Sequence, residues 1–198
     1  VSPVGLIELI EWYCTVETKY GFDMTHFFIN QKKFTVPAFQ VNDCASYIKI
    51  QSALRAYDIS IFQNTNPVAS LEAILHSNPN DVLLMDQQLL SLYASGLHFS
   101  SEKILALEAS ENNKTLNGVI RVLDFLQKNA VIKSEKIIVV GGGIIQEIGG
   151  FSAALYKRGI KWIYFPTTLL AMCDSCVGGK SSVNYAGAKN QLGLFSVP

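Results

Sequence analysis

From Tyr57 onward the chain alternates short apolar runs with longer stretches of helical spacing. The apolar runs are rich in β-branched residues and predict strands over 57–62, 81–86, 104–108, 136–140 and 162–165. The stretches between them predict helices over 68–76, 87–96, 115–129 and 144–158. Strands that are apolar throughout and separated by helices are typical of βαβ units around a parallel sheet. We therefore predict an α/β fold with helices on both faces of the sheet.

The helix expected over 115–129 has the clearest pattern. Its apolar residues fall at i, i+3, i+4, i+7 and i+10, in one stripe: Leu116, Val119, Ile120, Leu123 and Leu126. Such a stripe predicts a helix with one buried face.

Residues 1–50 do not follow this alternation. A helix is expected over 6–14 and a hairpin over 27–36, turning near Gln31 and Lys32. No candidate chemistry lies in this part, and the chain contains no internal repeat. We therefore divide it into a segment of unknown role, 1–50, and one predicted domain, 51–198.

The composition excludes several classes of protein. The 198 residues carry 16 basic and 16 acidic side chains, so no net charge draws the chain toward nucleic acid or an anionic membrane. Hydrophobic residues make up 49%, which is enough to exclude an intrinsically disordered chain. The longest uncharged apolar-rich stretch, 162–173, is shorter than the roughly 20 residues that span a bilayer.

The ends of the chain and its cysteines bear on its location. The first residues have no basic segment typical of a signal peptide, and four cysteines are too sparse for a disulfide scaffold of this size. We therefore expect a cytoplasmic protein. The chain has no initiator Met and no closing element after Ser196, so we expect it to be a piece of a longer protein.

The strand expected over 136–140 runs directly into three glycines, 141–143, before a helix. Glycines let backbone N–H groups approach a pyrophosphate, and a helix N-terminus supplies partial positive charge. Tight packing of the strand against the helix explains the same residues equally well. The glycines alone leave both interpretations open.

Polar residues are unexpectedly frequent in the apolar region that follows. Thr167 and Thr168 come at the carboxyl end of the last predicted strand, where open α/β sheets bind ligands. Asp174 and Lys180 then lie in surroundings with almost no other charge. One interpretation is a structural Asp–Lys pair, and the other is a site for a polyol phosphate.

Four blocks in this half of the chain together resemble a known family. They are GGGIIQEIGGFSAALYKRG at 141–159, FPTTLLA at 165–171, DSCVGGK at 174–180 and KNQLGLF at 189–195. Their order and separations are similar to those of 3-dehydroquinate synthase and the related sugar phosphate cyclases. The resemblance covers about 57–198 and implies the nucleotide-binding half of that fold, a Rossmann-like parallel sheet.

The resemblance also implies an activity. Family members are carbon–oxygen lyases that use NAD catalytically, eliminate phosphate from a heptulosonate phosphate and close it to 3-dehydroquinate in the shikimate pathway of aromatic amino acid biosynthesis. Their divalent metal, zinc or cobalt, is held by a Glu and two His of a second domain, which would lie beyond Pro198. This chain alone is therefore expected to hold no catalytic metal and to be inactive.

Site residues carry over by matching positions in the motifs. Those implied to contact NAD are Asp86, Glu111, Lys114, Gly142, Gly143, Glu147, Thr167, Thr168, Lys180 and Lys189. Those implied to face the sugar phosphate are Asp174, Lys180, Asn190 and Arg158. Arg158 resembles an arginine that reaches the phosphate in a neighbouring subunit, which implies a homodimer.

The chain departs from the family pattern near both expected ligands. Gln146 and Glu147 stand where Gly-Asp is usual, Gln88 and Ser110 where Asn and Gly are common, and Tyr185 and Ala186 where His-Pro is frequent. Two alternatives therefore stay open. One is a cyclase for another substrate such as sedoheptulose 7-phosphate, and the other is a non-catalytic NAD-binding module.

The remaining metal-binding residue types fit no recognisable site. Cys173 and Cys176 have the spacing of a metal or redox pair but no His or further Cys nearby, so we expect apolar packing for them. The three histidines, at 26, 76 and 98, lie in unrelated segments and are expected to have surface or core roles.

Overall fold

The structure is a computed structural model, and it describes residues 26–29, 32–35, 46–51, 56–61, 67–175 and 179–198. Its contacts divide the chain into two compact units, 1–50 with 58–63, and 51–57 with 64–198. The helix expected over 6–14 lies outside the described residues. No helix among those described is long and apolar enough to cross a membrane.

The first part of the chain forms two strand pairs. Strands β1 (His26–Ile29) and β2 (Lys32–Thr35) are antiparallel, with Phe27 opposite Phe34, which confirms the predicted hairpin. Strand β3 (Ser46–Gln51) pairs with β4 (Ala56–Ile61) in a separate two-stranded sheet.

Strand β4 corrects the expectation that residues 57–62 belong to the parallel sheet. Its partner is β3, and it pairs with none of the parallel strands. Tyr57 is buried while its neighbours Asp58 and Ser60 are exposed. Such alternation is typical of a strand with one solvated face, whereas strands of a covered parallel sheet are apolar throughout.

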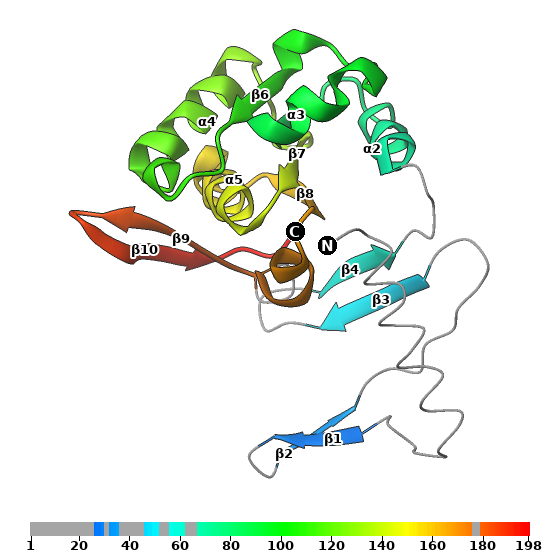
Figure 1. The fold of residues 1–198 in the computed structure, drawn as a ribbon, viewed down its shortest axis with the longest axis vertical. Helices are drawn as coiled ribbons and strands as arrows, with labels where there is room; N and C mark the ends of the chain where they lie inside the picture. The colour runs from blue at the N-terminus through cyan, green and yellow to red at the C-terminus, as the bar shows by residue number, and fades with distance from the viewer. Residues whose placement is uncertain (1–25, 30–31, 36–45, 52–55, 62–66, 176–178) are drawn as a thin grey trace. The chain divides into compact units, whose positions relative to one another are not determined.

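The second unit is built on a four-stranded parallel sheet with the order β6-β5-β7-β8 (Figure 1). Its strands are β5 (Val82–Asp86), β6 (Ile104–Leu107), β7 (Lys136–Gly141) and β8 (Lys161–Pro166). The chain leaves β5 toward β6 on one side and leaves β7 toward β8 on the other. The sheet therefore has its topological switch point between the carboxyl ends of β5 and β7, where ligands bind in open α/β sheets.

Helices cover both faces of this sheet, as predicted. The α-helices are α2 (Pro67–Leu75), α3 (Gln87–Tyr93), α4 (Leu116–Lys128) and α5 (Gly143–Leu155). Alternate residues of the strands face opposite sides. Leu83, Met85, Ile138 and Val140 pack with α2 and α3, whereas Leu84, Val139 and their neighbours pack with α4 and α5.

Short helical turns complete the connections. They are 3-10 turns at Ala94–Gly96, Ser101–Lys103, Glu111–Asn113 and Tyr156–Arg158, and a π-helical turn at Ala171–Ser175. Thr115 caps α4, accepting a hydrogen bond from the N–H of Gly118 at 3.4 Å. Helix α5 ends earlier than expected, because Lys157 and Arg158 adopt positive φ values of 48° and 64°.

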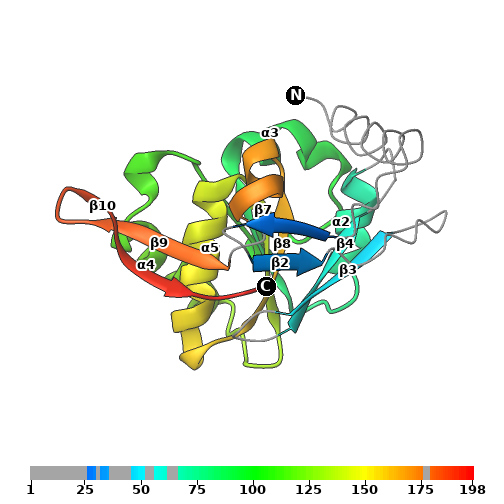
Figure 2. The same ribbon diagram turned by 90° about the horizontal axis from the view of Figure 1, so that it is seen from below.

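An antiparallel hairpin that the sequence did not suggest lies against α5. It consists of β9 (Lys180–Tyr185) and β10 (Ala188–Phe195), and both ribbon views show it beside the helix (Figures 1 and 2). Its two turn residues, Ala186 and Gly187, have φ of 50° and 80°, as a two-residue type I′ turn requires.

Two neighbouring glycines let α5 lie close to both layers. A Cβ on Gly149 would come within 2.7 Å of Val139 in the sheet. A Cβ on Gly150 would come within 2.6 Å of the Ser181 hydroxyl in the hairpin and 3.0 Å of Trp162. These glycines are therefore explained by packing between the sheet and the hairpin.

We expect Gly149→Ala to lower the free energy of unfolding by about 1–2 kcal/mol, measured by urea denaturation. Overpacking against Val139 and Leu84, both fully buried, outweighs the ~1 kcal/mol that alanine gains over glycine in a helix. Gly96→Ala is the control, because its Cβ would make only an ordinary contact of 3.8 Å with Val68. Equal stability of the two variants would contradict the packing account.

Candidate functional site

Candidate ligand-binding residues lie at the carboxyl edge of the parallel sheet. Asp86 ends β5 and accepts a hydrogen bond from the N–H of Gln88 at 3.0 Å, capping α3. Gly142 follows β7, and Thr167 follows β8 and donates its N–H to the carbonyl of Gly141 at 3.0 Å. Asp86 and Gly142 therefore flank the switch point of the sheet.

Packing accounts for part of the glycine turn. A Cβ on Gly141 would come within 2.7 Å of Ile145, so this glycine is needed for packing. Gly142 is the N-cap of α5 and provides no side-chain cap, and a Cβ there would come within 3.2 Å of the Thr168 methyl. The N-terminus of α5 thus presents backbone N–H groups beside Thr168, an arrangement suited to an anion.

A second group of polar residues, the Lys114 cluster, joins α5 to the hairpin. Its members are Glu111, Lys114, Glu147, Ser182, Asn184 and Asn190. Lys114 is only 6% exposed, and its Nζ lies 2.5 Å from Glu147 Oε2 and 2.6 Å from Asn190 Oδ1. The Ser182 hydroxyl lies 2.7 Å from Glu147 Oε1 and 3.1 Å from Asn190 Oδ1. The buried ammonium is therefore paired and hydrogen-bonded, as its burial requires.

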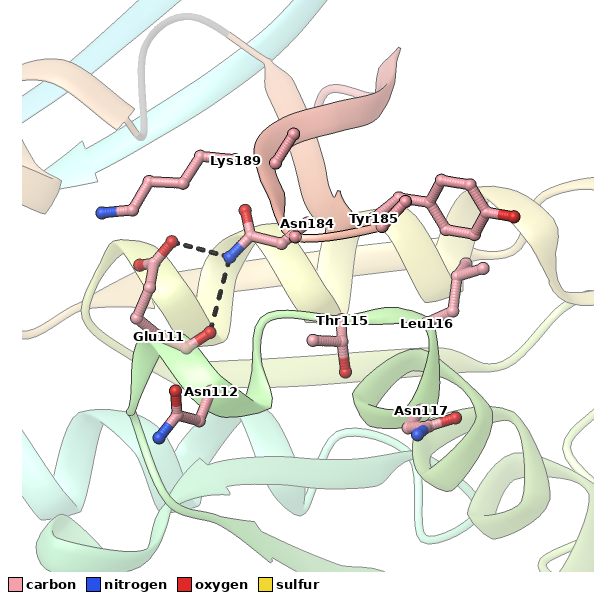
Figure 3. A pocket seen from close by; sticks show the side chains of 11 residues that line it. Glu111, Asn112, Thr115, Leu116, Asn117, Asn184, Tyr185 and Lys189 are labelled. Carbon is pink, nitrogen blue, oxygen red and sulfur yellow. Dashed lines mark hydrogen bonds between the residues drawn. The ribbon is translucent and has the colours of Figure 1, made fainter.

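Glu111 and Asn184 extend this cluster to the surface (Figure 3). Asn184 donates from Nδ2 to Glu111 Oε1 at 2.8 Å and accepts at Oδ1 from the N–H of Asn190 at 2.9 Å. The hydrogen bond from Asn184, helped by the positive charges of Lys114 and Lys189, holds the pKa of the Glu111 carboxyl below its usual value. The carboxylate is thus favoured in its charged form.

Figure 3 shows the open pocket that borders these two residues. Its volume is about 520 Å³, and it lies between the start of α4 and the hairpin turn, with Glu111, Thr115, Tyr185 and Lys189 among its lining residues. The expected NAD contacts Glu111 and Lys189 therefore line one cavity.

A second, smaller pocket has a volume of about 180 Å³ and is lined in part by Glu147. Besides Glu147 it is lined by Gln146, Asp174, Ser175 and Lys180. Asp174 and Lys180 are both exposed, and these two described residues form no ion pair with each other. The structural Asp–Lys pair considered above is therefore not seen, and both charges are available to a ligand.

Gln146 also lines this smaller pocket, although it is almost fully buried. It is 1% exposed, and its Nε2 donates to the carbonyl of Lys180 at 3.1 Å. Its Oε1 has no hydrogen-bond partner among the described residues. The side chain thus ties α5 to the start of β9 beside Lys180 and keeps a buried acceptor free.

One predicted site residue, Arg158, lies far from the glycine turn. Arg158 follows the C-terminal end of α5, whereas Gly142 precedes its N-terminus. Thirteen helical residues separate these ends by about 20 Å, so Arg158 does not join the other candidates within one chain. Its predicted role requires a second subunit.

The expectation of apolar packing for Cys173 is wrong, because this cysteine is exposed at the surface of the π-helical turn. Cys176 lies outside the described residues.

His98 is exposed and hydrogen-bonded to Glu72 at 2.9 Å, and His76 is exposed. No group of three or more His, Cys, Asp or Glu in the described parts of the chain is placed to hold a metal ion.

Sequence reasoning missed the roles of Gln146, Ser182 and Asn184 in this arrangement. The sequence indicates Gln146 only as a departure from the family pattern, and it assigns no role to Ser182 or Asn184. Their contacts depend on the hairpin lying against α5, which no periodicity in the sequence signals.

Comparison with known proteins gives a consistent result. Residues 104–198 match the family model described as 3-dehydroquinate synthase N-terminal. The chain is 37% identical over 128 residues to the 3-dehydroquinate synthase of Clostridium tetani, an alignment covering 63% of this chain and 34% of that protein. It is 32% identical over 158 residues to the enzyme of Paracoccus denitrificans, covering 76% and 43%.

A solved structure is similar over much of the same region. It is 2-deoxy-scyllo-inosose synthase complexed with carbaglucose-6-phosphate, NAD+ and Co2+, with a TM-score of 0.62 and 26% identity. The match covers 77% of this chain and 43% of that one. The chain thus spans less than half the length of these relatives.

We expect a double-mutant cycle of Lys114→Met and Glu147→Gln to show a coupling free energy of about 1–2 kcal/mol, measured by urea denaturation. Each single variant leaves one charge without its counter-charge, whereas the double variant removes both charges. A control cycle pairs Glu147→Gln with Lys128→Met, at the far end of α4. Coupling as small as in the control would mean that the ion pair contributes nothing to the fold.

Proposed function

We propose that this chain is the NAD-binding half of an enzyme that eliminates phosphate from a heptulosonate phosphate and closes it to 3-dehydroquinate. The chain belongs to the family of 3-dehydroquinate synthases and related sugar phosphate cyclases. One observation carries the proposal. Glu147, on the helix that starts at the glycine turn, lines the same pocket as Asp174 and Lys180. A nucleotide at the turn and a sugar phosphate in the pocket would therefore meet along α5.

The residues at the carboxyl edge fit NAD. The N-terminus of α5 offers backbone N–H groups for the pyrophosphate, and the missing side chain at Gly142 allows a close approach beside Thr168. Asp86 flanks the same switch point, where a carboxylate suits ribose hydroxyls. Gly143, Thr167, Glu111, Lys114 and Lys189 complete the proposed cofactor contacts.

The chemistry that NAD supplies in such an enzyme is transient oxidation of a substrate hydroxyl. A divalent metal, zinc or cobalt, supplies polarisation of a substrate oxygen, and its ligands are proposed to lie outside this chain. The residues of this chain bind and orient the substrate. Lys180 neutralises developing negative charge, Asp174 accepts hydrogen bonds from ring hydroxyls, and Asn190 donates to the phosphate.

Arg158 is proposed to act in a neighbouring copy. Within its own chain it lies at the end of α5 opposite the glycine turn, as described above. A homodimer in which this end of α5 faces the other subunit's pocket would bring its guanidinium to the phosphate, since arginine binds phosphate bidentately. The dimer is thus part of the proposed site.

We expect the complete product of the natural gene, assayed with NAD and Zn2+, to release phosphate from 3-deoxy-arabino-heptulosonate 7-phosphate. Lys180→Ala should reduce kcat at least 100-fold, on the order of one lost transition-state contact, while the melting temperature stays unchanged. Lys161→Ala removes an equal charge at the opposite edge of the sheet and should keep full activity.

Three results would count against this proposal. Full turnover by Lys180→Ala would remove that residue from the chemistry. Phosphate release only from sedoheptulose 7-phosphate would identify a different cyclase. No release from either substrate, by folded protein that binds NAD, would indicate a non-catalytic module.

A further inference from the structure

Asn184 lies opposite an irregular part of the hairpin. Tyr185 pairs with Ala188 and Val183 pairs with Leu192. On β9 one residue, Asn184, lies between the two paired positions. On β10 three residues, 189–191, lie between them. Strand β10 therefore carries a bulge of two extra residues, and this bulge contains Lys189 and Asn190.

A bulge leaves backbone groups without ladder partners, and the side chain of Asn184 satisfies one of them. Its Oδ1 accepts the hydrogen bond of the Asn190 N–H at 2.9 Å. Asn190 has a positive φ of 55°, a conformation that Asn tolerates better than most residues. The side chain of Asn184, on the opposite strand, thus holds the bulge in place.

The other end of the same amide holds a second segment. Asn184 Nδ2 donates to Glu111 Oε1 at 2.8 Å, and the Asn184 backbone N–H donates to the carbonyl of Lys114 at 2.8 Å. Glu111 starts the 3-10 turn that follows β6, and Lys114 comes directly after that turn. A single residue therefore connects this turn to the bulge.

We propose that Asn184 is a positioning residue that holds Glu111 with one end of its amide and Asn190 with the other, so that the turn and the bulge face the same ligands. Loss of this positioning would also affect the buried ammonium of Lys114. Asn190 Oδ1 is one of the two partners of the Lys114 ammonium, at 2.6 Å. Displacement of the bulge would remove this partner as well. For its meaning in catalysis the inference rests on the proposed function.

Two substitutions separate the two ends of the amide. Asn184→Ala removes both hydrogen bonds. Asn184→Asp has the same shape and keeps an oxygen that accepts from the Asn190 N–H, but it sets a second carboxylate against Glu111. Asn117→Asp is the charge-matched control, because Asn117 lines the pocket beside Glu111, is exposed and shows no side-chain hydrogen bond among the described residues.

The first measurement is NMR of the 198-residue chain without any ligand. Hydrogen exchange of the Asn190 amide should be about 10-fold or more faster in Asn184→Ala and near wild type in Asn184→Asp. The pKa of the Glu111 carboxyl should rise in both variants, and more in Asn184→Asp, because a neighbouring carboxylate disfavours the charged form. Asn117→Asp should leave the exchange rate unchanged.

The second measurement is NAD affinity by calorimetry. Asn184→Ala should raise the Kd about 10-fold, and Asn184→Asp should raise it too because it repels Glu111. Asn80→Asp adds the same charge in the turn before β5, at the opposite edge of the sheet, and should leave the Kd unchanged. A general loss of stability cannot give this pattern, since the two Asn184 variants are predicted to differ in amide exchange.

The inference is overturned if Asn190 exchange is unchanged in Asn184→Ala, or if both variants bind NAD as the wild type does. Failure of the wild-type chain to bind NAD would instead overturn the proposed function. In that case the exchange rate and the Glu111 titration, which use no NAD, still decide whether Asn184 holds the turn and the bulge.

Discussion

The candidate site depends on the close packing of α5 between two layers. Gly149 and Gly150 remove the side chains that would separate the helix from Val139 on one side and from Ser181 on the other. The hairpin can therefore approach α5 closely enough for Ser182 to reach Glu147 at 2.7 Å. With larger residues at these two positions, the side chains of the Lys114 cluster would be drawn apart.

The Lys114 cluster is the polar counterpart of this packing. A lysine that is 6% exposed would be costly without partners, and here two elements supply them: the helix through Glu147 and the bulge through Asn190. Such a network specifies where the hairpin lies, since a shift of either strand breaks several hydrogen bonds at once. It also places cationic and amide groups next to the pocket that contains Asp174 and Lys180.

The sequence was informative wherever local pattern and local structure agree. Apolar strands predicted the parallel sheet, and the stripe from Leu116 to Leu126 predicted α4. The strand at 57–62 was assigned to the wrong sheet, because its alternating polarity was given too little weight. The β9–β10 hairpin was missed because residues 180–191 carry few apolar side chains.

Some residues of the candidate site could also be predicted from the sequence, and others could not. Motifs similar to those of the cyclases indicated Glu111, Lys114, Glu147 and Asn190, and the structure brings these four into one cluster. Asn184 could not be assigned from the sequence, because its role depends on a bulge two residues long in the opposite strand. Gln146 is similar, since its contact with Lys180 joins segments 34 residues apart.

The central claim is that a nucleotide binds at the switch point of the sheet. The most direct test is a titration of the isotope-labelled chain with NAD, following backbone amides by NMR. We predict shifts at Asp86, Gly142, Gly143, Thr167 and Thr168, and none at Lys136 and Lys161, which begin β7 and β8 at the opposite edge. Gly142→Val should abolish the shifts while the spectrum stays that of a folded protein. Absence of shifts in the wild-type chain, or shifts confined to the opposite edge, would contradict the account.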